Sequence, residues 1–180
     1  MRRAESCGLY PLYTNPAKLH SMDRNRIFLS STLLLAVAVA PLSTSYALFD
    51  KTRFVLHLGA AYFAFHHWDL KPYQQGKFAA GAPGRTASLV KGGLALAFAA
   101  HEVTVARKVA ANSSSPLLQK LDGGMNSLSA EMSSVGARLK GGNLNPADLK
   151  ALDTDTQKFG ADSAAAGQTI KDVPVPIPGL

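Results

Sequence analysis

Residues 116–140 read PLLQKLDGGMNSLSAEMSSVGARLK, and they carry the clearest structural signal in the chain. Apolar side chains recur here at spacings that alternate between three and four residues, the heptad pattern of a helix with one buried face. Ser115-Pro116 is a helix start, because serine caps a helix and proline suits its first position. The pattern predicts a helix ending at Gly141-Gly142, with apolar positions Leu118, Leu121, Met125, Leu128, Met132, Val135 and Leu139.

A second helix is predicted after a short link, because Asn145-Pro146 repeats the start signal. Its apolar face is weaker, since small or hydroxyl side chains fill some positions; it comprises Leu149, Leu152, Thr156, Phe159, Ser163, Ala166 and Ile170. The short link predicts an antiparallel helical hairpin over residues 112–172.

The larger apolar side chains of these two helices are named here the interaction seam. They are Leu118, Leu121, Met125, Leu128, Met132, Val135, Leu139, Leu149, Leu152 and Phe159. A hairpin with a single seam is marginally stable alone, so we expect it to dock on the rest of the chain, to self-associate or to bind a helix of a protein partner. A partly frayed amphipathic region is the alternative.

Residues 173–180 contain alternating prolines and branched side chains, Val173-Pro174-Val175-Pro176-Ile177-Pro178. Proline has no backbone N–H and a fixed φ, so this pattern predicts an extended, polyproline-type tail. Such a tail either binds a groove or remains unengaged.

Two apolar segments precede the seam and form a predicted helical hairpin over residues 48–111. Residues 54–68 contain no formal charge, and residues 92–106 are apolar except for His101-Glu102. Residues 74–87 are rich in glycine and proline, which predicts a loop between the two helices.

This hairpin has two interpretations. As a membrane hairpin, its basic turn (Lys71, Lys77, Arg85 and Lys91 against Asp69) would lie in the cytoplasm, and the C-terminal part would be extracytoplasmic. As a soluble hairpin, its apolar faces would be ordinary core, which is common for segments of this length. We favour the membrane hairpin, because both segments are apolar all round.

Residues 22–47 resemble an export signal in their layout. Arg24 and Arg26 precede the apolar residues 27–42, and Ser45-Tyr46-Ala47 supplies the small residues of a cleavage site. An uncleaved N-terminal anchor is the alternative. Residues 1–21 show no periodicity, so we interpret them as an unstructured extension or as an artefact of the assigned start, with translation beginning at Met22.

Charge and cysteine content exclude several classes of protein. Of the net charge of +7, residues 1–111 carry +8 and residues 112–180 carry −1, and the Lys and Arg of the first part occur in ones and twos beside apolar runs. That distribution is typical of membrane topology rather than of a nucleic-acid interface, which needs clustered basic residues. The single cysteine, Cys7, excludes an intramolecular disulfide framework and a cysteine-ligated metal site.

Histidines are the one candidate for a cofactor site. In the predicted membrane hairpin, His57 and His101 would lie at the same depth on facing helices, the arrangement that ligates a b-type haem. The alternative is that both are ordinary polar contacts, with Glu102 pairing Arg53 or a histidine. The spacings of the histidines predict no metal site on a single helix.

The sequence contains no glycine-rich phosphate loop and no nucleophile elbow, and it indicates no small-molecule substrate. We therefore expect a non-enzymatic, exported protein of the cytoplasmic membrane or cell envelope that presents its C-terminal helices to a partner. A haem-binding membrane redox accessory protein using His57 and His101 is the alternative.

Overall fold

The structure, a computed structural model, describes residues 43–180, with side chains from residue 48 onward. The predicted extension over residues 1–21 and nearly all of the predicted signal over residues 22–47 lie outside this part. Within it, every regular element is helical and no strand occurs, so the predicted all-α class is confirmed for these residues. The helices are α1 (Ser43–Phe65), the π-helical turn η1 (His66–Leu70), α2 (Lys71–Gln74), α3 (Arg85–Asn112), α4 (Pro116–Gln119), α5 (Asp122–Lys140) and α6 (Pro146–Ala165).

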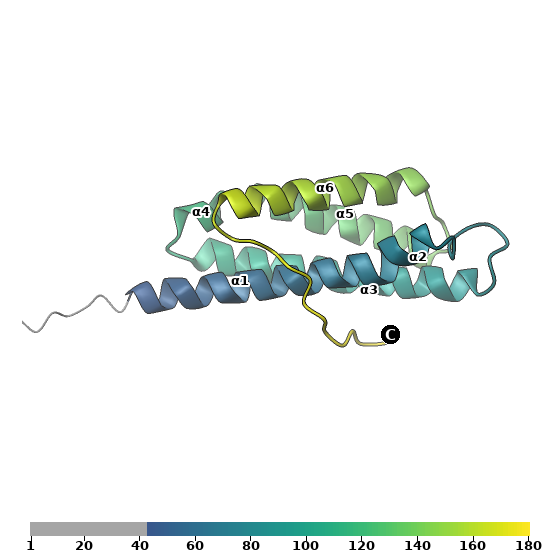
Figure 1. Ribbon diagram of the computed structural model, residues 1–180, viewed down its shortest axis with the longest axis horizontal. Coiled ribbons are helices and arrows are strands. Elements are labelled where there is room, and N and C mark those ends of the chain that lie inside the picture. Colours follow the sequence, from purple (N-terminus) through teal and green to yellow (C-terminus); the bar gives the residue numbers. More distant parts are fainter. Residues whose placement is uncertain (1–42) are drawn as a thin grey trace, which may run out of the picture. The chain divides into compact units, whose positions relative to one another are not determined.

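The four long helices form a bundle (Figure 1). Helix α3 packs along α1 on one side and along α5 on another, and α6 packs on α5 and touches η1. Helices α1 and α3 lie below α5 and α6 in the view of Figure 1. The apolar segments of the sequence thus share one core with the C-terminal helices.

Helices α3 and α5 pack closely against each other, and each has a glycine at the point of contact. Gly93 of α3 faces Gly136 of α5, and both are buried. A Cβ atom on Gly136 would lie 3.0 Å from Cβ of Leu96 and 3.1 Å from the carbonyl oxygen of Gly93. Since real Cβ atoms rarely approach so closely, the missing side chains allow the two backbones to meet.

The helix predicted over residues 116–140 is two helices in the structure, α4 and α5. A tight turn separates them, in which the N–H of Leu121 donates to the carbonyl of Leu118 at 3.1 Å. Gly123 and Gly124 follow in the first turn of α5, and glycine costs about 1 kcal/mol in a helix interior.

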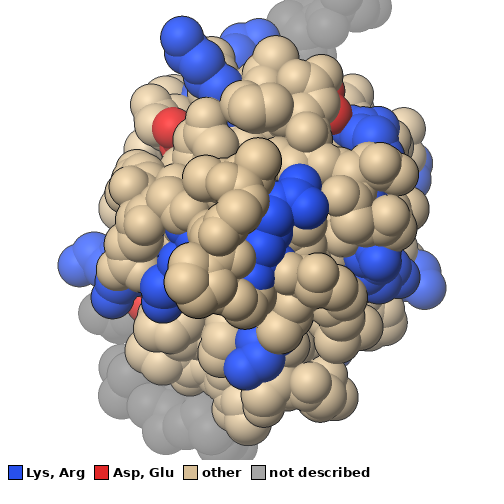
Figure 2. Space-filling model, turned by 90° about the vertical axis from the view of Figure 1, so that its right-hand side faces the viewer, with Lys and Arg blue, Asp and Glu red and all other residues tan. Residues whose placement is uncertain are grey.

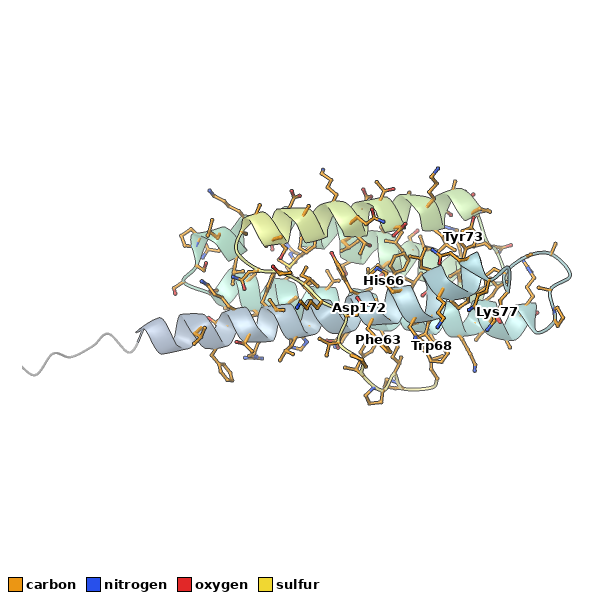
Figure 3. All side chains as sticks on the ribbon, in the orientation of Figure 1. Phe63, His66, Trp68, Tyr73, Lys77 and Asp172 are labelled. Carbon is orange, nitrogen blue, oxygen red and sulfur yellow. The ribbon has the colours of Figure 1, made fainter. Side chains whose placement is uncertain are left out.

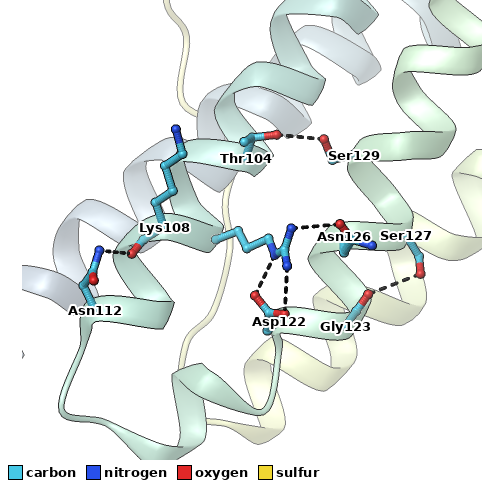
Figure 4. A network of polar contacts seen from close by, with 9 residues as sticks. Thr104, Lys108, Asn112, Asp122, Gly123, Asn126, Ser127 and Ser129 are labelled. Atoms are coloured by element: carbon cyan, nitrogen blue, oxygen red, sulfur yellow. Dashed lines mark hydrogen bonds and ion pairs between the residues drawn. The ribbon is translucent and has the colours of Figure 1, made fainter.

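Arg107, near the end of α3, contacts Asp122 at the start of α5, which Figure 4 labels. Its Nε donates to Asp122 at 2.6 Å, a second nitrogen donates to the same carboxylate at 3.2 Å, and a third contact reaches Asn126 at 2.8 Å. The hydrogen bond from Arg107 lowers the pKa of Asp122. One turn away, the hydroxyls of Thr104 and Ser129 lie 2.9 Å apart.

Candidate functional site

The interaction seam lies inside the bundle. All ten of its side chains are buried, and they belong to the same core as the apolar side chains of α1 and α3. The two buried hydroxyls of α6 have hydrogen-bond partners as well. Thr156 donates to the carbonyl of Leu152 at 2.7 Å, and Ser163 donates to the carbonyl of Gln168 at 2.8 Å. The seam therefore holds the helices of this chain to one another, and any partner contact must use another surface.

His57 and His101 are not brought face to face. Nδ1 of His57 lies 2.6 Å from Oε2 of Glu102, across the contact between α1 and α3. Neighbouring residues on a helix point about 100° apart, so a helix that directs Glu102 at His57 directs His101 elsewhere. His101 is exposed. Haem binding by this pair stays a prediction, and the geometry favours the polar-contact alternative.

Asp69 is the one buried group of the described residues whose oxygens both lack a hydrogen-bond partner. It sits in η1 and is fully buried, with Oδ1 directed at Gly92 of α3 and the ring of Phe78 beside it. Burial raises the pKa of Asp69 well above its usual range. An ionised carboxylate is costly in such surroundings, so burial favours the protonated form of this side chain.

Sequence reasoning counted Asp69 as one charge of the basic turn and missed its burial. A signal was present, because Asp69 directly follows an uncharged segment and Pro72 comes three residues later. The π-helical turn inserts one extra residue per turn, which rotates the following side chains around the helix. Period-3.6 reasoning does not anticipate that rotation, so the inward position of Asp69 was not foreseen.

The tail is docked on the bundle. It crosses α1, where the N–H of Val173 donates to the carbonyl of Gly59 at 3.0 Å (Figure 1). Nδ1 of His66 lies 2.9 Å from Oδ2 of Asp172, and Figure 3 shows these two residues on adjoining segments. Ile177 is buried in the common core. Gly59 was not recognised from sequence as the residue that lets the tail approach α1.

An acidic cavity of about 230 Å³ lies between α5 and α6. Glu131, Asp155 and Asp162 line it, together with Lys158 and Phe159. Burial, followed by the hydrogen bond and charge of Asp155, raises the pKa of Glu131 to about 7. The cavity therefore holds a carboxyl that titrates near neutral pH.

Among the described helices, α3 alone is long and apolar enough to cross a membrane, and half of its most apolar stretch is buried inside the bundle. The large apolar side chains that are exposed lie on three helices: Leu48 (67% exposed), Phe49 (65%) and Leu56 (49%) on α1, Val90 (38%) on α3 and Leu117 (49%) on α4. Comparison of the chain with protein-family models, curated proteins and solved structures finds no match.

Proposed function

We propose that this chain is a non-enzymatic, exported protein associated with the cytoplasmic membrane or cell envelope, with its helical bundle outside the cytoplasm. The observation that carries the proposal is the pair of large apolar side chains, Leu48 and Phe49, that are exposed at the start of α1 and available to a membrane surface. The apolar residues 27–42 lie immediately upstream of α1 in the sequence. Such a segment either directs export or anchors the chain.

Polar groups in the bundle support a structural rather than a catalytic use of this chain. Tyr62 donates to the carbonyl of Thr156 at 2.6 Å and so joins α1 to α6. The Ser129 hydroxyl donates to the carbonyl of Ala100 at 3.0 Å and joins α5 to α3. Together with the pair of His57 and Glu102, these contacts link helices to one another.

This packing fits a bundle that binds the membrane from its extracytoplasmic side. It fits less well an arrangement in which residues 54–106 cross the membrane twice. Leu144, in the link between α5 and α6, and Pro146, the first residue of α6, line one cavity with Phe78 and Ala80 of the α2–α3 loop. Segments that line one cavity lie on the same side of a membrane. Two crossings would instead separate the loop from the C-terminal helices.

The outer surface of α5 and α6 is the proposed contact surface for a protein partner or a second copy. Its exposed side chains are small or polar, including Ser127, Ser133 and Ser134 on α5 and Lys150 and Gln157 on α6. Surfaces of this kind form polar interfaces of modest affinity rather than obligate apolar ones.

Protease digestion of intact spheroplasts tests the proposal with epitopes inserted separately at residues 80 and 140. We expect the chain in the envelope fraction and both epitopes removed by external protease. Protection of both epitopes, or recovery of the chain in the cytosol, would contradict export. Removal of the epitope at 140 with protection of the one at 80 would restore the two-crossing arrangement.

A further inference from the structure

One end of the bundle carries unpaired positive charge drawn from several segments. We call it the basic end: Lys71, Lys77, Arg85, Lys91 and Lys140. None of these cations takes part in an ion pair within the described residues, whereas Arg107 and Arg138 each pair with an aspartate. Figure 2 views the bundle from this end and shows Lys and Arg side chains spread across it.

Burial of Asp69 increases the positive charge of this surface. Asp69 is the single acid in residues 69–91, and the structure withdraws it into the core. Asp148, the acid at the start of α6, is neutralised by Arg138 at 2.8 Å. The basic end therefore exposes cations with few acids to offset them, and the field that they create attracts anions.

The basic end also has a built pocket. A cavity of about 260 Å³ is lined by Trp68, Lys71 and Lys77, with His67, Pro72 and Gln75 completing it. The ammonium of Lys91 lies 5.7 Å from the centre of the Trp68 ring. Figure 3 shows Trp68, Tyr73 and Lys77 together at this end of the ribbon. An indole surrounded by three lysines offers an apolar surface beside a cluster of ammonium donors.

We infer that this pocket and the basic end bind the headgroups of anionic phospholipids. Lysine ammoniums recognise phosphate as point charges, and tryptophan and tyrosine are the residues that favour the membrane–water interface. Each basic residue near an anionic membrane adds to its binding through the surface potential. This inference rests on the proposed membrane association, and it adds which class of lipid is bound and which surface of the protein binds it.

The surface favours lipid over nucleic acid. Single-stranded nucleic acids bind grooves in which several aromatic rings stack successive bases. Here the single indole is only partly exposed and already has a lysine above it, while Phe78 of the adjacent loop is buried. The exposed loop between these residues and α3 contains Ala79, Ala80 and Gly81, which supply no stacking surface.

Trp68 provides the readout, because it is the one tryptophan in the chain. The full chain is mixed with vesicles of phosphatidylcholine alone or of phosphatidylcholine with phosphatidylglycerol, and acrylamide quenching of its fluorescence is measured. We expect the anionic vesicles to protect Trp68 and neutral vesicles not to, and we expect high salt to abolish the protection. Insertion of apolar N-terminal residues does not depend on lipid charge, so neutral vesicles control for it.

Two double variants test the location of the contact. Lys71→Gln with Lys77→Gln removes two cations from the pocket, and we expect the affinity for anionic vesicles to fall about 30-fold. Lys108→Gln with Lys120→Gln removes the same charge from exposed positions near the other end of the bundle, and we expect less than about a twofold change. Far-ultraviolet circular dichroism verifies that both variants keep their helices.

The outcomes separate this inference from the proposed function. If the protein sedimented with both kinds of vesicle and Trp68 were equally quenched in each, membrane association would stand. Binding of anionic lipid by the basic end would then be overturned. No sedimentation with either would overturn both. An equal loss in the two double variants would overturn the location. Protection of Trp68 by an oligonucleotide but not by anionic vesicles would overturn lipid as the ligand.

Discussion

The carbonyl oxygen of Gly136 lies 2.7 Å from the position that a Cβ atom on Gly93 would occupy. The backbone nitrogen of Lys140 lies at 2.8 Å from the same position. The side-chain Cγ of Lys140 is also close to this position, but the carbonyl oxygen and the nitrogen belong to the backbone of α5, which cannot rotate away as a side chain can. The separation of α3 and α5 is thus set by the absence of a methyl group at residue 93.

Gly93→Ala should destabilise the bundle. The added methyl has to push α5 away from α3 and disturb the apolar contacts on both sides of the crossing. Overpacking of this kind costs about 1–3 kcal/mol. Urea denaturation followed by far-ultraviolet circular dichroism measures the loss.

Gly123→Ala is the matched control, because a Cβ atom added to this exposed glycine of α5 would meet no other atom within 4 Å. Alanine favours the helix, so we expect a gain of about 0.5–1 kcal/mol. A similar loss in both variants would mean that packing at Gly93 is not the cause.

Val173→Pro should release the tail from α1. Proline removes the N–H that donates to the carbonyl of Gly59. We expect faster trimming of Leu180 by a carboxypeptidase and a loss of roughly 1 kcal/mol in unfolding free energy, the usual net value of one hydrogen bond.

Val175→Pro is the control for the tail, since the Val175 N–H makes no backbone hydrogen bond in the described residues and the residue already lies between two prolines. Its trimming rate should match that of the unchanged chain. If the carboxypeptidase trimmed Val175→Pro as fast as Val173→Pro, the faster trimming would be a general effect of an added proline. Loss of the hydrogen bond to Gly59 would then not be its cause.

Glu131→Gln should stabilise the protein at pH 8 and leave it nearly unchanged at pH 4. The folded pKa of Glu131 is raised from 4.5 to about 7, so the stability that its protonated form contributes is complete below pH 4.5 and is lost as the pH rises through 7. Glutamine cannot ionise beside Asp155. Solvent screens this repulsion, so we expect a gain of about 1 kcal/mol at pH 8 from thermal denaturation.

Asp69→Asn should change the dependence of stability on pH. The folded pKa of Asp69 is raised, so wild-type stability declines as the pH rises above 3.8, where the unfolded carboxyl ionises and the folded one does not. The asparagine variant lacks this decline. Its unfolding free energy relative to wild type should therefore increase between pH 4 and pH 8, and a constant difference would contradict a protonated Asp69.

Local patterns in the sequence predicted the helices better than their assembly. Asn145-Pro146 predicted the start of α6, and the Asn145 side chain does accept from the N–H of Ala147 at 3.1 Å. The alternation of apolar side chains in residues 116–140 predicted which of them are buried. Both signals act within a few residues, where propensity and capping dominate.

Such local patterns do not predict contacts between segments that are far apart in the sequence. Nothing local in residues 54–68 indicates that Gly59 receives the tail or that η1 turns Asp69 inward. Glu102 had several possible partners, and the choice of His57 depends on how α1 and α3 pack. The basic residues were visible in the sequence, but their gathering at one end with Lys140 of α5 required the fold.

The tail's contact with α1 also bears on the order in which the protein can complete its fold. Gly59 and Val173 are brought together across almost the whole described chain, and residues 168–180 follow every described helix in synthesis. This contact therefore belongs to the last part of the fold to be completed, because its two partners are so far apart in the sequence. If the chain is exported as proposed, this delay keeps α1 free of the tail until the residues after α6 have emerged on the same side.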